Sequence, residues 1–237
     1  MRLLLGGGGH VPMDRRQVLI SEIQQFLGTA IKKCLFIPYA LHGWDLSVEE
    51  YHELGMNAGY HLDPIHKHDD QVRAVNEAEA IYVDGGNTFR LLKTLYDLHL
   101  LEPMKERARA GTPIIGLSAG ANIACPTIQT TNDMPIVWPP SPVALDLIPF
   151  QLNTHYVDLT TEPGFRGETR LQRIEQYLEE NNTTVVGLRE GAILRREGDK
   201  LQLCGTSGAR IFIKGHSPQD LLPDDPVDFL LRQPSST

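Results

Sequence analysis

Residues 113–125 read PIIGLSAGANIAC. The stretch opens with a short apolar run, and the small residues that follow Ser118 are typical of a helix packed closely on a sheet. GLSAG also fits G-x-S-x-G, the nucleophile elbow, in which a serine lies on a strained turn between a strand and a helix. We therefore predict a buried strand, a turn at Ser118 and a short helix, with Ser118 as a candidate nucleophile. The alternative is a glycine- and serine-rich turn without chemistry.

The same alternation of short apolar runs and segments of helical period recurs upstream. Apolar runs at 2–5, 34–40, 59–65 and 80–84 are each followed by a segment of helical period. Strands that are apolar on both faces and alternate with helices are typical of a parallel sheet covered by helices. We therefore predict a three-layer α/β fold with a mostly parallel sheet.

Three helix starts can be read from the residues that precede them. Ser47 and Glu50 have the spacing of a capping box, so a helix is expected from Ser47. Asp69 and Asp70 are expected to open the next helix. Asn87 and its neighbour Thr88 are expected to open the helix after the glycine pair at 85–86.

The chain after residue 125 has a different pattern. Residues 126–146 are rich in proline and predict an ordered loop, and a helix is expected over 167–180. Four short strands follow, at 184–188, 192–196, 200–204 and 210–214, and the turns that join them, such as REGDK, predict an antiparallel hairpin region on one side. We predict one catalytic domain, 1–237, with 218–237 as a surface tail.

Composition excludes several kinds of protein. A formal net charge of −8 and a pI near 5.6 disfavour binding to nucleic acid or to an anionic membrane. No apolar run is long enough to cross a bilayer, and the run at 2–5 is too short for a secretion signal, so we expect a cytoplasmic protein. Three widely spaced cysteines are expected to be reduced, buried and structural: Cys34, Cys125 and Cys204.

A serine nucleophile needs a base, and histidine is the usual one. Two histidines follow Ser118 in the chain. His155 ends an apolar run that should deliver it to the carboxyl edge of the sheet, where sites of open α/β sheets gather, so we choose His155. In α/β-hydrolases the acid precedes the histidine, and an esterase of that fold would have to use His216 instead.

The base needs a carboxylate that fixes its tautomer and stabilises the imidazolium. Glu190 follows the apolar run TTVVGL at a turn and is one candidate. Asp133, in TTNDMP, competes for the same role or shapes the substrate pocket. The oxyanion needs backbone donors, of which the N–H of Ala119 is one. A second is expected near the glycine pair at 85–86.

Taken together, these motifs resemble peptidase E, the α-aspartyl dipeptidase family of serine peptidases. The resemblance implies a class I glutamine amidotransferase-like, flavodoxin-like fold. It also implies that Ser118 is the nucleophile, His155 its base and Glu190 its acid, with Gly86 and Ala119 as oxyanion donors. The segments that carry it occur in the family's order: GGNTF at 85–89, GLSAGANIACPTI at 116–128, TTNDMPIV at 130–137, NTHY at 153–156, GETRLQRI at 167–174 and GLREG at 187–191.

The family removes an amino-terminal aspartate from Asp-X dipeptides, so the resemblance implies a cation that reads a carboxylate. Arg170 in GETR is the best match, because a guanidinium can hold a carboxylate with two hydrogen bonds. Arg166 and Arg173 are expected to lie on a solvated helix face. Asp133 and Asn87 are further candidates for substrate contact. We expect a monomer or homodimer that needs no cofactor.

The sequence departs from the family in three places. GGGGH at 6–10 replaces a stretch that contains Ser or Asn, and without a P-loop lysine it predicts a flexible turn. Asn-Thr precedes His155 where Asn-Pro is common, and Arg189 precedes Glu190 where proline is common. These changes affect orientation rather than the catalytic atoms.

Other functions remain open at this point. HLDPIHKHDD at 61–70 could suggest a metal site, but a strand end followed by an acidic helix start explains it without metal. Within the same fold, a cyanophycinase-like β-aspartyl hydrolase would also use the serine. A catalytically silent, amidotransferase-like binding module is the alternative from a different class, and the linkage cut, α or β, is open.

Overall fold

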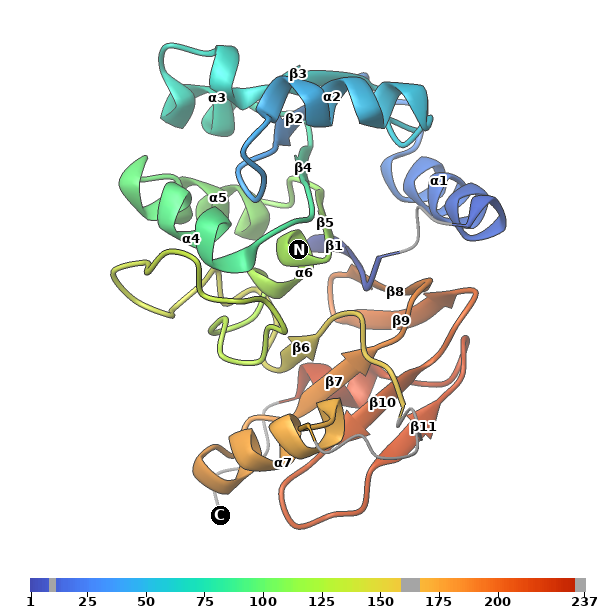
Figure 1. The fold of residues 1–237 in the computed structure, drawn as a ribbon. Coiled ribbons are helices and arrows are strands. Elements are labelled where there is room, and N and C mark those ends of the chain that lie inside the picture. The colour runs from blue at the N-terminus through green and yellow to red at the C-terminus, as the bar shows by residue number, and fades with distance from the viewer. Residues whose placement is uncertain (9–11, 159–166, 233–237) are drawn as a thin grey trace.

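The computed structural model describes residues 1–8, 12–158 and 167–232 (Figure 1). Its centre is a seven-stranded sheet in the order β3-β2-β4-β5-β1-β8-β9. The first five of these strands are parallel, and β8 and β9 are antiparallel to β1 and to each other. The strands span β1 (Arg2–Gly6), β2 (Lys33–Ile37), β3 (His61–Pro64), β4 (Ile81–Val83), β5 (Ile114–Leu117), β8 (Ala192–Glu197) and β9 (Lys200–Gly205).

Helices cover both faces of this sheet, because its strands are apolar on both sides. Leu4 points into one core together with buried residues of α1 and α2, whereas Leu3 and Leu5 point into another with residues of α3 to α6. The three-layer α/β architecture predicted above is confirmed. The helices span α1 (Met13–Leu27), α2 (Trp44–Glu53), α3 (Gln71–Glu77), α4 (Thr88–Asp97), α5 (Leu101–Arg109), α6 (Ala119–Asn122) and α7 (Arg170–Glu180), with a 3₁₀ turn η1 (Ile65–Lys67).

A second sheet lies below the first in Figure 1 and was not predicted as a separate sheet. Its four strands have the order β11-β10-β7-β6. β6 and β7 are parallel, and β10 and β11 are antiparallel additions. One side packs against α7 through Tyr156, Ile174 and Phe212. The strands span β6 (Gln151–Asn153), β7 (Val185–Leu188), β10 (Ala209–Phe212) and β11 (Gln219–Leu221).

The predicted hairpin region is therefore divided between the two sheets. β8 and β9 form a hairpin that extends the central sheet next to β1, whereas β10 pairs with β7. Short apolar strands give no sequence signal for their partners, since pairing depends on neighbours distant in the chain. The segment after Pro218 supplies β11 and the 3₁₀ turn η2 (Asp228–Leu231), and the side chains of Val227 and Leu230 are buried.

The helix starts were predicted with mixed success. Asp70 and Asn87 are N-caps, and their side chains accept the backbone N–H of Arg73 and Arg90. The predicted start at Ser47 is wrong, because α2 begins three residues earlier, at Trp44. Ser47 lies inside the helix and is buried, and its hydroxyl donates to the buried Asp84 instead of capping the backbone.

Candidate active site

Ser118 lies on the strained turn that its sequence context predicts. It follows β5 directly, has a φ of 52° and precedes α6. Two glycines allow the close approach of strand and helix. A Cβ on Gly116 would lie 2.3 Å from the carbonyl oxygen of Gly120, and a Cβ on Gly120 would lie 2.4 Å from that of Val83. The turn therefore holds the Ser118 hydroxyl at the end of the central sheet.

Ser118, His155 and Glu190 are joined in a line of hydrogen bonds. Ser118 Oγ lies 2.7 Å from Nε2 of His155, and Nδ1 of the same ring contacts Oε1 of Glu190. His155 follows β6 and Glu190 follows β7, so both come from the second sheet, whereas Ser118 comes from the first. The prediction that His155 would lie at the carboxyl edge of the same sheet as Ser118 is wrong, although the two side chains do meet.

The glycine segment after β1 is packed against these residues. Gly8 is buried, and a Cβ there would lie 2.5 Å from Oε2 of Glu190 and 2.9 Å from Cε1 of His155. A Cβ on Gly7 would lie 2.8 Å from the carbonyl oxygen of Arg189. The predicted flexible turn is therefore wrong at Gly7 and Gly8. There the backbone lies so close to Arg189, Glu190 and His155 that only glycine fits. Residues 9 and 10 of GGGGH lie outside the described residues.

Asp133, the competing acid, does not contact His155. Its Oδ2 accepts the backbone N–H of Thr88 at 2.7 Å and the Thr88 hydroxyl at 2.5 Å. Its Oδ1 has no hydrogen-bond partner within the described ranges. Asp133 nevertheless lines the same pocket as Ser118 and His155. The geometry thus gives the carboxylate contact of His155 to Glu190 and leaves Asp133 facing the substrate space.

Two backbone N–H groups near Ser118 are free to bind an oxyanion. Gly86 has a φ of 129°, and a Cβ there would lie 2.8 Å from the carbonyl oxygen of Ala40. In the described part of the chain, the N–H groups of Gly86 and Ala119 donate to no acceptor. Both residues therefore lie where the sequence predicts donors.

The structure adds a buried acid, Asp84, that the sequence reasoning missed. It accepts hydrogen bonds from the Gly85 N–H, the Ser47 hydroxyl and the Tyr51 hydroxyl at 2.6, 2.5 and 2.5 Å. Burial raises the pKa of Tyr51 well above its usual value, and the Asp84 charge adds to the shift. Asp84 thus ties the Gly85–Gly86 loop to α2. An aspartate directly before a glycine pair was the available signal.

These groups open into a pocket of about 380 Å³. Its lining includes four apolar side chains, Leu41, Leu54, Met56 and Leu117, and the polar side chains of Asp84, Asp133, Ser118 and His155. The other lining residues are Gly8, Glu50, Tyr51, Gly85 and Gly86.

Two predicted substrate contacts lie beside this pocket rather than in its wall. Asn87 caps α4, and its Nδ2 donates to the carbonyl oxygen of Met134 at 2.8 Å. Arg170 is the first residue of α7. Burial is the main cause that lowers the pKa of its guanidinium; the Arg173 charge adds to this, and the Asp133 charge opposes it. Within the described ranges Arg170 has no hydrogen-bond or ion-pair partner, so its cation is available near Asp133.

The alternative sites take no part in this arrangement. His216 lies on the surface, where Nδ1 is 3.0 Å from the carbonyl oxygen of Lys214, so the esterase reading with His216 as base is wrong. His66 and His68 contact different carboxylates, those of Asp45 and Asp63. Nowhere in the described ranges do three or more possible metal ligands gather. No helix there has the length and apolar character that spanning a membrane requires.

Comparison with known proteins identifies the family of the chain. Residues 3–204 match the model of peptidase family S51. The chain belongs to peptidase family S51. It is therefore a serine-type peptidase. Peptidase E of Nostoc sp. is 42% identical over 238 residues, which cover 99% of this chain and 98% of the relative. A protein of Drosophila melanogaster described as a probable alpha-aspartyl dipeptidase is 39% identical over 226 residues, 95% of this chain and 93% of the relative.

Solved structures support the fold of the peptidase. A putative peptidase E from Listeria monocytogenes EGD-e aligns with a TM-score of 0.64 and 22% identity over 87% of this chain and 98% of that one. A peptidase from an acI-B1 Actinobacterium aligns with a TM-score of 0.66 and 20% identity over 95% and 96% of the two chains. At these identities the likeness supports the architecture, including its mixed sheet.

Proposed function

We propose that the peptidase is an aspartyl dipeptidase that hydrolyses Asp-X through an acyl-enzyme on Ser118. The observation that carries the proposal is the line of contacts from Ser118 through His155 to Glu190, at a pocket with free backbone N–H groups. The names of the relatives, peptidase E and probable alpha-aspartyl dipeptidase, supply the substrate class.

The proposed reaction follows from which atom can accept a proton. His155 Nε2 takes the Ser118 proton as Oγ attacks the carbonyl carbon of the aspartyl residue. Glu190 accepts the Nδ1–H, keeps Nε2 free for this step and stabilises the imidazolium. The oxyanion binds the N–H groups of Gly86 and Ala119. His155 then protonates the leaving amine, and the same residues hydrolyse the ester with water.

Recognition of the first residue needs two opposite charges. Arg170 carries a partly buried cation without a partner among the described residues, and we assign it to the side-chain carboxylate of the substrate. Asp133 lines the pocket and its Oδ2 is bonded to Thr88, so we assign its Oδ1 to the substrate's amino-terminal ammonium. Arg170 would thus select a substrate with an acidic first residue, although the protein as a whole is acidic. Asp133 would require that this residue carry a free amino group.

The test is a set of peptides offered to the purified protein: Asp-Leu, Glu-Leu, Asn-Leu, β-linked Asp-Leu and N-acetyl-Asp-Leu. We expect cleavage of Asp-Leu alone. Replacing Arg170 by Met should lower kcat/KM for Asp-Leu by about 10- to 100-fold, since a hydrogen bond to a charged group contributes about 1.5–3 kcal/mol. Arg173→Met is the matched control, because Arg173 is on the same helix but contacts Glu168, at 3.6 Å.

Other results would redirect the proposal. Equal cleavage of Asn-Leu would remove Arg170 from carboxylate recognition. Cleavage of only the β-linked peptide would favour the cyanophycinase-like reaction. A protein that cleaves nothing and does not react at Ser118 with a serine-directed phosphonate would be the silent binding module. A single catalytic domain, a cytoplasmic location and a monomeric or dimeric state remain predictions.

A further inference from the structure

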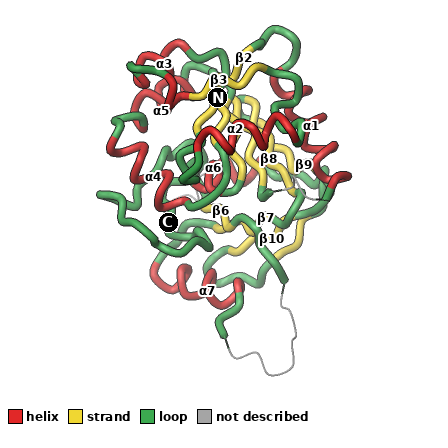
Figure 2. Tube along the Cα trace, turned by 45° about the horizontal axis from the view of Figure 1, so that its top comes forward, coloured by secondary structure: helices red, strands yellow, loops and turns green. Residues whose placement is uncertain are grey.

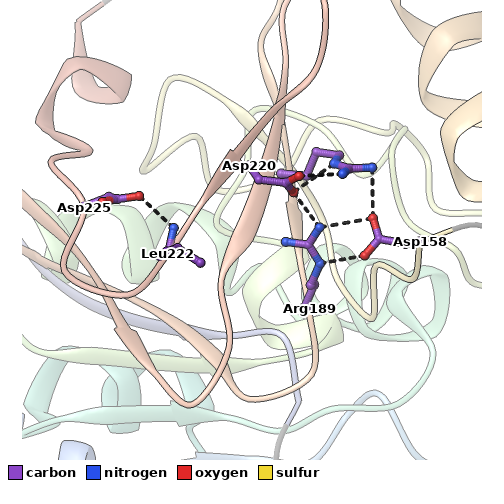
Figure 3. Close-up of polar contacts among 6 residues, drawn as sticks. Asp158, Arg189, Asp220, Leu222 and Asp225 are labelled. Atoms are coloured by element: carbon purple, nitrogen blue, oxygen red, sulfur yellow. Dashed lines mark hydrogen bonds and ion pairs between the residues drawn. The ribbon is translucent and has the colours of Figure 1, made fainter.

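We infer that a cluster of four charged residues positions the second-sheet half of the active site. The residues, called here the Arg–Asp cluster, are Asp158, Arg189, Arg210 and Asp220. Figure 3 labels all of them except Arg210. Arg189 contacts Asp158 at 2.9 and 3.1 Å and Asp220 at 2.6 Å. Arg210 contacts Asp158 at 2.9 Å and Asp220 at 2.5 and 2.9 Å. Each arginine therefore bridges both aspartates, and the four residues close a ring.

The ring joins the two segments that carry His155 and Glu190. Asp158 comes three residues after His155, and Arg189 directly precedes Glu190. The other two members are neighbours on the antiparallel strands, since Arg210 of β10 and Asp220 of β11 are register partners. The cluster therefore attaches both site-bearing segments to one rigid ladder at the edge of the second sheet.

The packing beneath the cluster connects the same segments. The Tyr156 N–H donates to the carbonyl oxygen of Leu188 at 2.9 Å, and the Tyr156 ring is buried. A Cβ on Gly187 would lie 2.7 Å from that ring, so the strand approaches it as closely as glycine allows. The Arg189 guanidinium lies over the same ring, 5.8 Å from its centroid. The Tyr156 ring therefore packs between Gly187 on one side and the Arg189 guanidinium of the cluster.

The charges favour a fixed geometry at this place. The hydrogen bonds from Arg210 and Arg189 lower the pKa of Asp220 to about 2, and the contact with Arg189 lowers the pKa of Asp158. About half of each aspartate is exposed, so the ion pairs contribute little to global stability. Two-pronged guanidinium contacts still restrict direction strongly. The cluster therefore acts on orientation more than on folding.

The site needs such a restraint for a physical reason. His155 has a φ of 53°, a backbone conformation that costs energy and persists only where its surroundings hold it. The pairing of β6 with β7 ends at Asn153 and Gly187, so His155 and Glu190 both lie beyond the ladder, and Glu190 must reach Nδ1 of His155 from the end of the neighbouring strand. We assign the Arg–Asp cluster, and Arg189 above all, the role of setting their relative position. This role rests on the proposed function for its kinetic part only.

The experiment compares three variants of the full chain. Arg189→Lys keeps the charge but loses the forked contact, and Asp158→Asn removes the carboxylate between the arginines. Asp225→Asn is the matched control, because Asp225 accepts the Leu222 N–H at 2.8 Å near the same strand, outside the cluster (Figure 3). With Asp-Leu, the first two should lower kcat by about tenfold with KM changed less than about twofold, since small displacements of reacting groups are costly. Asp225→Asn should leave both unchanged.

A double variant separates positioning from a general loss of structure. If Arg189 acts through Glu190, Arg189→Lys should have no further effect on kcat in an enzyme that already carries Glu190→Gln. Independent, multiplying effects would overturn the inference, as would a kcat for Arg189→Lys equal to that of Asp225→Asn.

A second measurement does not depend on catalysis. The downfield proton resonance of the His155 Nδ1–H, assigned by its loss in His155→Gln, should be sharp in the wild type and in Asp225→Asn. It should broaden or move in Arg189→Lys and Asp158→Asn. If the wild type cleaves no Asp-X peptide, the proposed function fails, and this resonance still decides the inference. An identical resonance in all four proteins would refute it.

Discussion

Replacing Glu190 by glutamine should remove most of the activity while leaving the fold intact. Two unit charges about 4 Å apart interact by about 4 kcal/mol at an effective dielectric constant of about 20. The His155 and Glu190 side chains are 41% and 37% exposed, so we halve this to roughly 2 kcal/mol, or about 30-fold in rate. A glutamine can also donate to Nδ1 and place the imidazole proton on Nε2, where it blocks the attack. The expected loss in kcat is therefore between about 30-fold and about 10⁴-fold.

The matched variant is Asp133→Asn, which tests the acid that the sequence left as a competitor. Because Asp133 contacts Thr88 and not His155, it should raise KM for Asp-Leu while kcat changes less than about threefold. Steady-state kinetics on both variants, with circular dichroism to show that they are folded, would measure this. A glutamine variant at 190 that retains wild-type kcat, together with a large loss of kcat at 133, would refute the assignment of Glu190.

Three further results follow from the packing and the charges. Gly116→Ala should destabilise the protein by about 1–3 kcal/mol or more and reduce activity, because its Cβ would overlap the Gly120 carbonyl. The control is Gly111→Ala, where φ is 99° and no atom lies near the added Cβ, so only backbone strain of about 1–2 kcal/mol is expected. Urea unfolding measures both. Iodoacetamide at pH 8 should leave the activity unchanged, because burial raises the pKa of Cys125 to about 12; inactivation with labelled Cys125 would contradict this. The pKa of Asp220 is lowered to about 2, so its stabilisation is complete above the unfolded value near 3.8 and is lost as the pH falls through 2. The difference in unfolding free energy between wild type and Asp220→Asn should therefore shrink over that range, and a constant difference would count against the ion pairs.

The local features of the site could be read from the sequence because each has a short-range cause. The elbow at Ser118 depends on neighbouring glycines, and Asn87 caps a helix that begins at the next residue. The contact between His155 and Glu190 was found through the family pattern. The prediction that the cysteines are buried is confirmed for Cys34 and Cys125 and is wrong for Cys204, which is partly exposed.

The errors arose where a residue's partner is distant in the chain. Ser47 has the spacing of a capping residue, but its hydroxyl donates to Asp84, 37 residues away. The division into two sheets was missed because β10 and β8 have similar patterns and differ only in their partners. The sequence could not show that Gly8 packs against His155 and Glu190, because those residues follow strands far along the chain.

Figure 2 shows the strands of both sheets; Ser118 follows a strand of one sheet and His155 a strand of the other, so in the proposed mechanism activity depends on the contact between the two sheets. Loosening the smaller sheet would leave the elbow, the large sheet and most of the secondary structure in place, yet Ser118 would lose its contact with His155, the proposed base. Turnover therefore depends on the alignment of the two sheets. Mild denaturant should abolish activity at a lower concentration than the one at which circular dichroism shows unfolding.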